Sequence, residues 1–91
     1  MRPVIVCTEH RGVFYGYTGD SSQTIIERGN VALTDARMAI YWGTDRGVMQ
    51  LAETGPTGSS KISAKTDITI NKITAVFEVS DVAHEAWKKV A

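Results

Sequence analysis

The sequence predicts one small α+β domain spanning residues 1–91, with an antiparallel β-sheet of about five to six strands, a short middle helix and a C-terminal helix packed on one face. Three observations predict it. Strand-type runs separated by turn signals fill residues 4–42 and return at 67–79. Helical spacing of apolar residues is confined to 44–54 and 80–90. Apolar residues make up 43% and charged residues 22%, which is the composition of a folded globular chain.

The first element expected is a hairpin. Residues 4–8 are apolar and largely β-branched, and the run 12–18 alternates two sets, Val13, Tyr15 and Tyr17 against Phe14, Gly16 and Thr18. The polar residues between the two runs form the connection. These two strands therefore begin the sheet.

Further strands are expected up to residue 42. Residues 19–22 are a turn by composition, residues 23–27 form a third strand, and Gly29-Asn30 gives another turn signal. Residues 31–34 and 38–42 then flank the polar break at 35–37. That pattern predicts either a second short hairpin or one bent strand.

The middle helix is predicted after residue 43. Thr44 or Asp45 can cap it, residues 48, 49, 51 and 52 place apolar groups on one side, and Gly55-Pro56 ends it. Residues 57–60 follow as a flexible loop.

The last third of the chain combines a long β-branched run with the closing helix. Residues 67–79 place apolar side chains on both parities, which one straight strand cannot bury on one face, so a bulge or tight turn is expected near Asn71-Lys72. Ser80 or Asp81 caps the helix that follows. Its apolar stripe, which should cover a sheet face, comprises Val82, Ala83, Ala86, Trp87 and Val90, opposite Glu85, Lys88 and Lys89.

Charge and cysteine content exclude some classes of binding partner and favour one cellular location. Ten lysine and arginine residues balance ten aspartate and glutamate residues, so no net field favours broad nucleic-acid binding or an anionic membrane. Cys7 is the single cysteine, which excludes an internal disulfide and favours a reducing, cytoplasmic location. The apolar run near the start is too short for a signal segment or a membrane span.

No catalytic or metal-binding pattern is visible. His10 and His84 are far apart in sequence, lack ligand-spaced neighbours, and are expected to be solvated surface residues. Cys7 lies in an apolar run, where a buried, inert thiol is expected. We therefore predict a protein without enzymatic activity, metal or cofactor.

The candidate ligand site surrounds the start of the middle helix. Tyr41 and Trp42 can stack a base, and helix amides with Arg46 can hold a phosphate. The alternative is that both aromatics belong to the core and rim of the fold. The loop 55–61 has glycines and a lysine but lacks the P-loop spacing, so it is either a mobile surface loop or a ligand-closing one. The predicted ligand-binding residues are Arg11, Tyr41, Trp42, Thr44, Arg46, Ser59, Ser60 and Lys61.

Four segments carry a resemblance to a known family. Residues 4–6 (VIV), 12–16 (GVFYG), 36–43 (ARMAIYWG) and 48–55 (VMQLAETG) resemble a family of small uncharacterised proteins from tailed phages and prophages. The similarity runs over most of the chain and departs at Tyr41, where the family pattern has two tryptophans around that point. No catalytic residues are carried over from it.

The resemblance implies a viral context, in which small cytosolic binding proteins blunt host defence. One such class sequesters the nucleotide second messengers of bacterial immunity, commonly as oligomers. We therefore expect a sponge for a small nucleotide-type ligand, acting in the host cytoplasm as a homo-oligomer, because a core of this size without disulfide or metal is marginal. The alternative is a protein-interaction module that inhibits or redirects a host protein through a sheet edge or aromatic patch.

Overall fold

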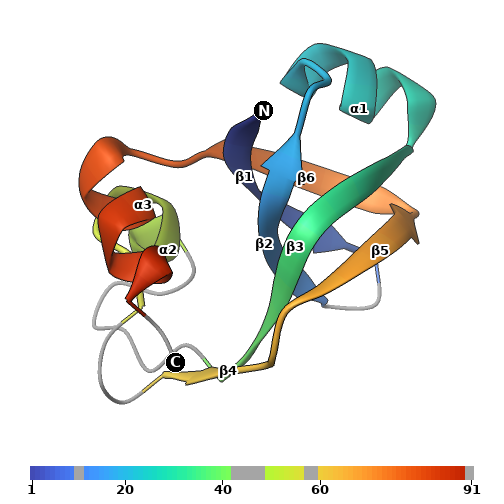
Figure 1. Ribbon diagram of the computed structural model, residues 1–91. Helices are drawn as coiled ribbons and strands as arrows, with labels where there is room; N and C mark the ends of the chain where they lie inside the picture. Colours follow the sequence, from blue (N-terminus) through green and yellow to red (C-terminus); the bar gives the residue numbers. More distant parts are fainter. Residues whose placement is uncertain (10–11, 42–48, 57–59, 90–91) are drawn as a thin grey trace.

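The computed structural model describes residues 1–9, 12–41, 49–56 and 60–89, and it has the predicted α+β architecture (Figure 1). Antiparallel strands form a sheet, and short helices pack beside it. The strands are β1 (Arg2–Thr8), β2 (Val13–Thr18), β3 (Asn30–Tyr41), β4 (Lys61–Ile62), β5 (Thr66–Asn71) and β6 (Ile73–Glu78). The helices are α1 (Ser22–Arg28), α2 (Met49–Glu53) and α3 (Asp81–Lys88).

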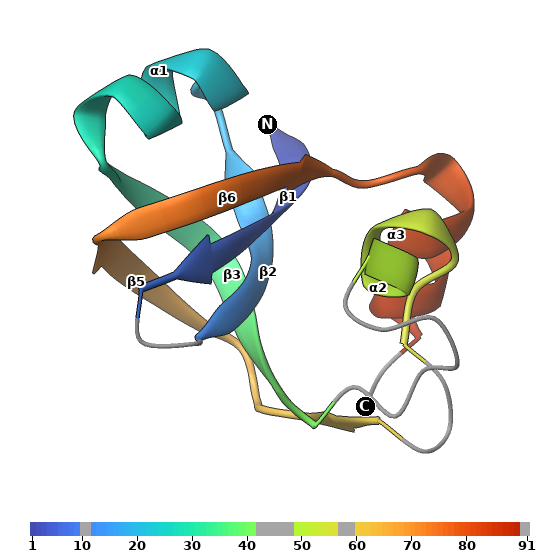
Figure 2. The ribbon, with the colours of Figure 1, turned by 180° about the vertical axis from the view of Figure 1, so that it is seen from behind.

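The sheet curls because β5 and β6, which follow one another in the chain, pair with strands toward its two opposite edges. The strand order is β4-β3-β2-β1-β6, and β5 also pairs with β3. β5 and β6 are separated only by Lys72, whose φ of 56° is left-handed, so the chain passes from the β3 edge to the β1 edge in one sharp corner (Figure 2). The amide of Glu9 donates to the Lys72 carbonyl at 2.9 Å and supports the corner. The turn predicted near Asn71-Lys72 is confirmed.

Curling buries β1 on both faces and divides the core in two. Val4 and Val6 face an inner core, while Ile5 between them faces an outer core, as strand alternation requires. The predicted hairpin of β1 and β2 is confirmed by their antiparallel register. The buried inner core is completed by Ile25, Val31, Leu33, Ala36 and Ile70, and the outer core by Val13, Tyr15, Ala39, Leu51, Ala83 and Trp87.

β3 is one bent strand, which decides between the two alternatives predicted for residues 35–37. Its register against β2 shifts between Tyr15 and Tyr17, and its register against β5 shifts over the same stretch of β3. Asp35, at a φ of 50°, lies within this bulge. Gly16 faces it across the sheet, where a Cβ would come within 2.9 Å of the Leu33 Cβ, so only glycine allows this close approach.

The third predicted strand, residues 23–27, is wrong, because this segment is helix α1. Ser21 caps it by accepting from the Thr24 amide, and Gly29 ends it in the left-handed conformation at φ 77°. Ile25 is buried in the inner core. The β-branched run favoured a strand, but the serine and glycine caps and the burial of one side chain outweigh that preference.

The two later helices pack together on the outer core face. The Trp87 indole Nε1 donates to the Leu51 carbonyl at 3.0 Å and so ties α3 to α2. Gly55, at φ 87°, follows α2, and a Cβ there would lie 2.5 Å from the Ala86 Cβ of α3. The predicted end of the middle helix is therefore confirmed, whereas its predicted caps, Thr44 and Asp45, lie outside the described residues.

The C-terminal helix begins at the predicted cap but buries a narrower stripe than expected. Ser80 accepts from the Ala83 amide at 3.1 Å. Ala83 and Trp87, one helical turn apart, are buried, but Val82 is 66% exposed, so its assignment to the buried stripe is wrong. Val82 lies about 100° around the helix from Ala83, beyond the reach of the sheet. Among the described residues, no helix is long and apolar enough to span a membrane.

Candidate functional site

The residues predicted as a ligand site are only partly visible. Arg11, Trp42, Thr44, Arg46 and Ser59 lie outside the described residues, as does the side chain of Tyr41. The backbone of Tyr41 pairs with Lys61, which starts β4, and the half-buried Ser60 precedes it. The structure thus brings the end of β3 next to the end of the loop 55–61, as a joint site would require, and leaves the rest of that prediction open.

A different site is fully described, and we call it the basic pocket. It has a volume of about 330 Å³. Strand β2, the bulge of β3, the segment between β4 and β5, and the last turn of α3 each contribute to it. Its lining residues are Tyr15, Tyr17, Asp35, Arg37, Lys65, Trp87 and Lys88.

The aromatic wall of the basic pocket is rigid. The rings of Tyr15 and Trp87 stack with their centroids 4.4 Å apart and their planes 8° from parallel. They are 3% and 1% exposed, so neither ring has a free face on which a nucleobase could stack. A ligand in this pocket therefore meets ring edges and hydroxyl groups.

A chain of hydroxyl groups leads from this wall to α3. The Tyr15 hydroxyl donates to that of Tyr17 at 3.2 Å, and the Tyr17 hydroxyl lies 2.9 Å from Nε2 of His84. Burial, and then the hydrogen bond to Tyr17, raise the pKa of Tyr15 far above its ordinary value, so it stays protonated. The prediction that His84 is a solvated surface residue is wrong, because it is half-buried and also packs edge-on against the Tyr17 ring.

Three cations line the basic pocket against one carboxylate. Arg37 is only 4% exposed, and its Nε donates to the Ser63 carbonyl at 3.1 Å. Lys88 pairs with Glu85 at 2.9 Å, and the pKa of Glu85 is lowered mainly by this hydrogen bond. Lys65 is exposed to solvent. A nearly buried guanidinium beside two lysines favours a ligand with anionic oxygen atoms.

The bulge of β3 is what places Asp35 and Arg37 at the pocket. The Asp35 amide donates to Oδ1 of Asp67 at 2.9 Å, which fixes the left-handed backbone there. Two residues later, Arg37 is paired with Tyr15 across the sheet. Strained backbone at such a position is common in binding sites, where the surrounding structure holds it in place.

Sequence reasoning missed this pocket because its residues are distant in the chain. The alternation in β2 did place Tyr15 and Tyr17 on one face, and the break at residues 35–37 was recognised. The two tyrosines and the residues at the break come together only through the bulge of β3, and no local sequence pattern specifies the strand register there. A pair of same-face tyrosines and an arginine at a strand break were the signals present.

The described residues contain no group of three or more histidine, cysteine, aspartate or glutamate side chains placed to hold a metal ion. No curated protein and no solved structure matches the chain. A family model does match, over residues 1–87, a span that includes every lining residue of the basic pocket except Lys88. By this match the chain belongs to the family described as domain of unknown function DUF6948.

Proposed function

We propose that the protein binds a small nucleotide-type anion in the basic pocket without converting it. The single observation that carries this proposal is the nearly buried Arg37 at a pocket that also presents Lys65 and Lys88. A guanidinium presents a fork of donors that matches phosphate oxygens, and lysines add charge around it.

The size of the pocket indicates which part of a nucleotide it holds. A volume of about 330 Å³ is at the lower end of the range for small-molecule sites, roughly 300–1,000 Å³. We infer that the phosphate and ribose occupy it. Asp35 is the one carboxylate of the lining and can accept from sugar hydroxyls. The base then extends outward, since the stacked faces of Tyr15 and Trp87 are closed to it.

Binding without conversion is supported by the state of the polar groups. The hydroxyls of Tyr15 and Tyr17 hydrogen-bond to one another and toward His84. The raised pKa of Tyr15 keeps it from acting as a base near neutral pH. This chain of hydroxyls can donate to a bound anion but does not present an activated nucleophile.

The more specific form of the proposal is a sponge that sequesters a nucleotide-derived immune signal in the host cytoplasm. The resemblance of four sequence segments to tailed-phage proteins supports this form. A protein-interaction module that inhibits a host protein is the alternative, and the same experiment separates the two.

The experiment combines ligand capture with a melting screen. The protein is incubated with cell extract, repurified and heat-denatured, and an intact nucleotide is expected in the supernatant. In parallel, a panel of nucleoside monophosphates, cyclic dinucleotides, cyclic trinucleotides and ADP-ribose derivatives is added to the purified chain. At about a hundred times Kd the ligand stabilises the fold by about 2.7 kcal/mol, a melting-temperature rise on the order of ten degrees.

The control is the double variant Lys65→Gln with Lys88→Gln, which keeps polar side chains at both positions and removes two charges of the lining. Its melting temperature should rise less with the ligand than that of the wild type, because its affinity is lower. Flat melting curves for the wild type, together with a co-purifying protein, would favour the interaction module. A cleaved nucleotide would overturn the proposal of a non-enzymatic protein.

A further inference from the structure

The chain of hydroxyls in the basic pocket ends at a histidine that is not part of the pocket lining. The Tyr17 hydroxyl accepts from that of Tyr15 at 3.2 Å and lies 2.9 Å from Nε2 of His84. Tyr15 and Tyr17 line the pocket, whereas His84 belongs to α3 and contacts the pocket wall at Tyr17. The protonation state of His84 can therefore reach a ligand through the Tyr17 hydroxyl.

The Tyr17 hydroxyl has one proton, and His84 decides where that proton points. A bare Nε2 can only accept, so the Tyr17 hydroxyl donates to it and has only a lone pair left for the pocket. A charged imidazolium has a proton on both nitrogens, so Nε2 donates instead. The Tyr17 oxygen then accepts from both Tyr15 and His84, and its own proton can point to a ligand.

The charge of the imidazolium acts in the same direction as the freed proton. A neutral ring can also carry its single proton on Nε2, but only the charged ring adds a positive charge beside Tyr17. Histidine ordinarily changes its charge between pH 5 and pH 8. An anion bound close to it stabilises the charged form.

Cations outnumber carboxylates around His84 on the side of the basic pocket. On α3, Glu85 follows His84 and pairs with Lys88 at 2.9 Å. The helix and its C-cap also carry Asp81 and Lys89. The charged residues of the pocket lining are Asp35, Arg37, Lys65 and Lys88. A bound anion would therefore add the negative charge that this side of α3 has in the smaller number.

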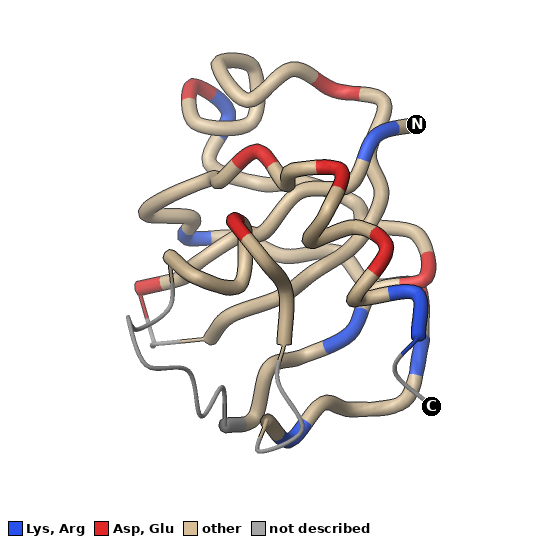
Figure 3. The backbone as a smooth tube through the Cα atoms, turned by 90° about the vertical axis from the view of Figure 1, so that its left-hand side faces the viewer, with Lys and Arg blue, Asp and Glu red and all other residues tan. Residues whose placement is uncertain are grey.

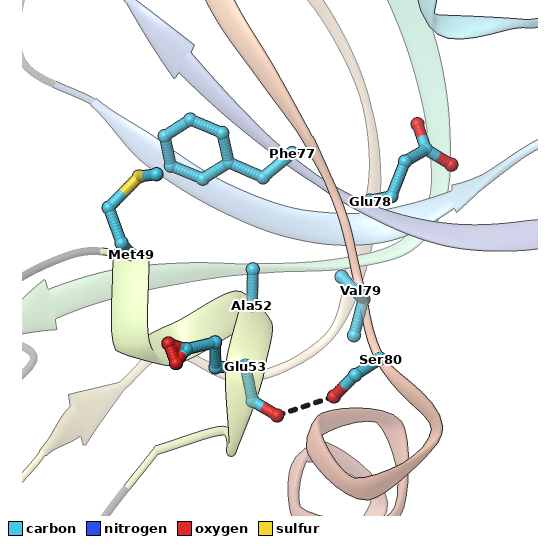
Figure 4. A pocket seen from close by; sticks show the side chains of 7 residues that line it. All are labelled: Met49, Ala52, Glu53, Phe77, Glu78, Val79 and Ser80. Atoms are coloured by element: carbon cyan, nitrogen blue, oxygen red, sulfur yellow. Dashed lines mark hydrogen bonds between the residues drawn. The ribbon is translucent and has the colours of Figure 1, made fainter.

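The other element packed against α3 is α2, whose one charged residue, Glu53, lies at the far end of α3 from the basic pocket. There a second cavity of about 460 Å³, which we call the apolar groove, lies between α2 and the end of β6 (Figure 4). Met49 and Phe77 point toward one another across it, and the Glu53 carbonyl accepts from the Ser80 hydroxyl. Its other lining residues are Ala52, Glu78 and Val79. The groove offers mainly apolar contacts, so the groups that suit an anion are those of the basic pocket.

We propose that the Tyr17 hydroxyl donates to the anion in the basic pocket and that binding of this anion takes up a proton at His84, a proposal that rests on the proposed function of the pocket. Tyr17 then contacts the ligand, and His84 is a positioning residue that acts through it. By linkage, an anion that stabilises the charged imidazolium is bound more tightly by the charged form, and by the same factor. Affinity for the anion should therefore rise as the pH falls from 8 to 6.

The first test counts protons by calorimetric titration at pH 7 in two buffers that differ in their enthalpy of ionisation. The main probe is adenosine 5′-sulfate, because its charge is constant in this range, whereas a phosphate monoester titrates near pH 6. Adenosine monophosphate is titrated in parallel. We expect uptake of up to one proton per site, and an affinity for the sulfate that is roughly fivefold or more higher at pH 6 than at pH 8.

Three variants locate the proton. His84→Gln keeps a polar side chain without an ionisable group, so it should bind either ligand with less proton uptake than the wild type. Tyr17→Phe keeps the ring but removes the hydroxyl, so it should lose most of the gain in affinity at pH 6. His10→Gln is the matched control, since His10 is the other histidine of the chain, and it should keep the uptake of the wild type. Circular dichroism of each variant checks the fold.

Nuclear magnetic resonance tests the same link without a substitution at His84. The ring signals of both histidines are followed from pH 5 to pH 8, and His10→Gln identifies those of His84. With adenosine 5′-sulfate bound, His84 should stay charged to a higher pH than without it.

The outcomes separate this proposal from the proposed function. A wild-type chain that binds either ligand with no more proton uptake than His84→Gln overturns the role of His84 and leaves anion binding intact. Unchanged affinity and uptake in Tyr17→Phe would overturn the role of Tyr17. A wild-type chain that binds neither adenosine 5′-sulfate nor adenosine monophosphate overturns both proposals.

Discussion

The two ends of helix α3 carry sites of opposite character. At its N-terminal end, the apolar groove is lined by Met49, Phe77 and Val79 and is flanked by carboxylates. At its C-terminal end, the basic pocket combines hydroxyls with Arg37 and Lys88. In Figure 3 the lower part of the view carries blue segments, while the middle and upper parts carry both red and blue segments. The balanced charges of the chain are therefore unevenly distributed over the described residues.

The helix itself shares this polarity. Asp81 lies in its first turn and Lys88 in its last turn, which is the arrangement that the helix dipole favours at each end. The two ends differ in rigidity as well. Stacking and hydrogen bonds hold the aromatic wall of the pocket, whereas Met49 at the groove is mostly exposed. The difference indicates a preformed site for a small polar ligand at one end and an adaptable apolar surface at the other.

The largest effect is expected for Trp87→Ala, which removes the element that both ends share. The variant loses the stacking on Tyr15 and the hydrogen bond to Leu51, so the free energy of unfolding should fall by about 3–5 kcal/mol. Chemical denaturation measures it. Val82→Ala, at an exposed position of the same helix, is the control and should change stability by less than about 0.5 kcal/mol. Equal effects would show that α3 is not anchored through this ring.

High pH should destabilise the fold at the pocket end through Tyr15. Burial raises the pKa of Tyr15 above its ordinary value of 10.0, so above that pH the unfolded chain releases a proton that the folded chain keeps. Stability is thus unaffected by this group below about pH 10 and falls above it by up to about 1.4 kcal/mol per pH unit.

Tyr15→Phe should remove this dependence. Burial also raises the pKa of the Cys7 thiol above 9.0, so both measurements are made in a Cys7→Ala background. Unfolding free energies at a series of pH values give the slopes. An unchanged alkaline slope in the phenylalanine variant would mean that another group carries the titration.

Ser80→Ala should weaken the groove end by about 1 kcal/mol, within the range of 0.5–2 kcal/mol typical of lost helix caps. The serine accepts from the Ala83 amide and donates to the Glu53 carbonyl, and alanine can do neither. Amide hydrogen exchange should quicken in the first turn of α3, while the pocket hydrogen bonds stay protected. Uniformly faster exchange across the helix would show that the two ends do not open separately.

Sequence patterns predicted the sheet better than the pocket, because the signals for the sheet lie close together in the sequence and the residues of the pocket do not. Residues within a few positions of each other indicate the hairpin, the turn at Lys72 and the cap at Ser80. α1 was missed because a β-branched run concealed a helix whose caps, Ser21 and Gly29, outweigh local preference. The burial of Ile25 in the inner core favours the helix over a strand, and the local sequence does not predict that burial.

The basic pocket required three long-range facts. Tyr15 pairs with Arg37 across neighbouring strands, the bulge at Asp35 places Arg37 at the pocket, and Trp87 comes from the last helix of the chain. None of these is local. The predicted ligand residues, by contrast, were chosen for local chemistry around Tyr41, and most of them lie outside the described residues.

The most direct test of the central claim is calorimetric titration with adenosine monophosphate and with adenosine. We predict that the monophosphate binds and the nucleoside does not, because the positive charges of Arg37, Lys65 and Lys88 attract the phosphate. Lys65→Gln with Lys88→Gln should weaken binding by roughly tenfold or more, while changing stability by less than about 0.5 kcal/mol, as expected at exposed positions. Equal binding of nucleoside and nucleotide, or unchanged affinity in the double variant, would contradict the assignment of this pocket to a phosphorylated ligand.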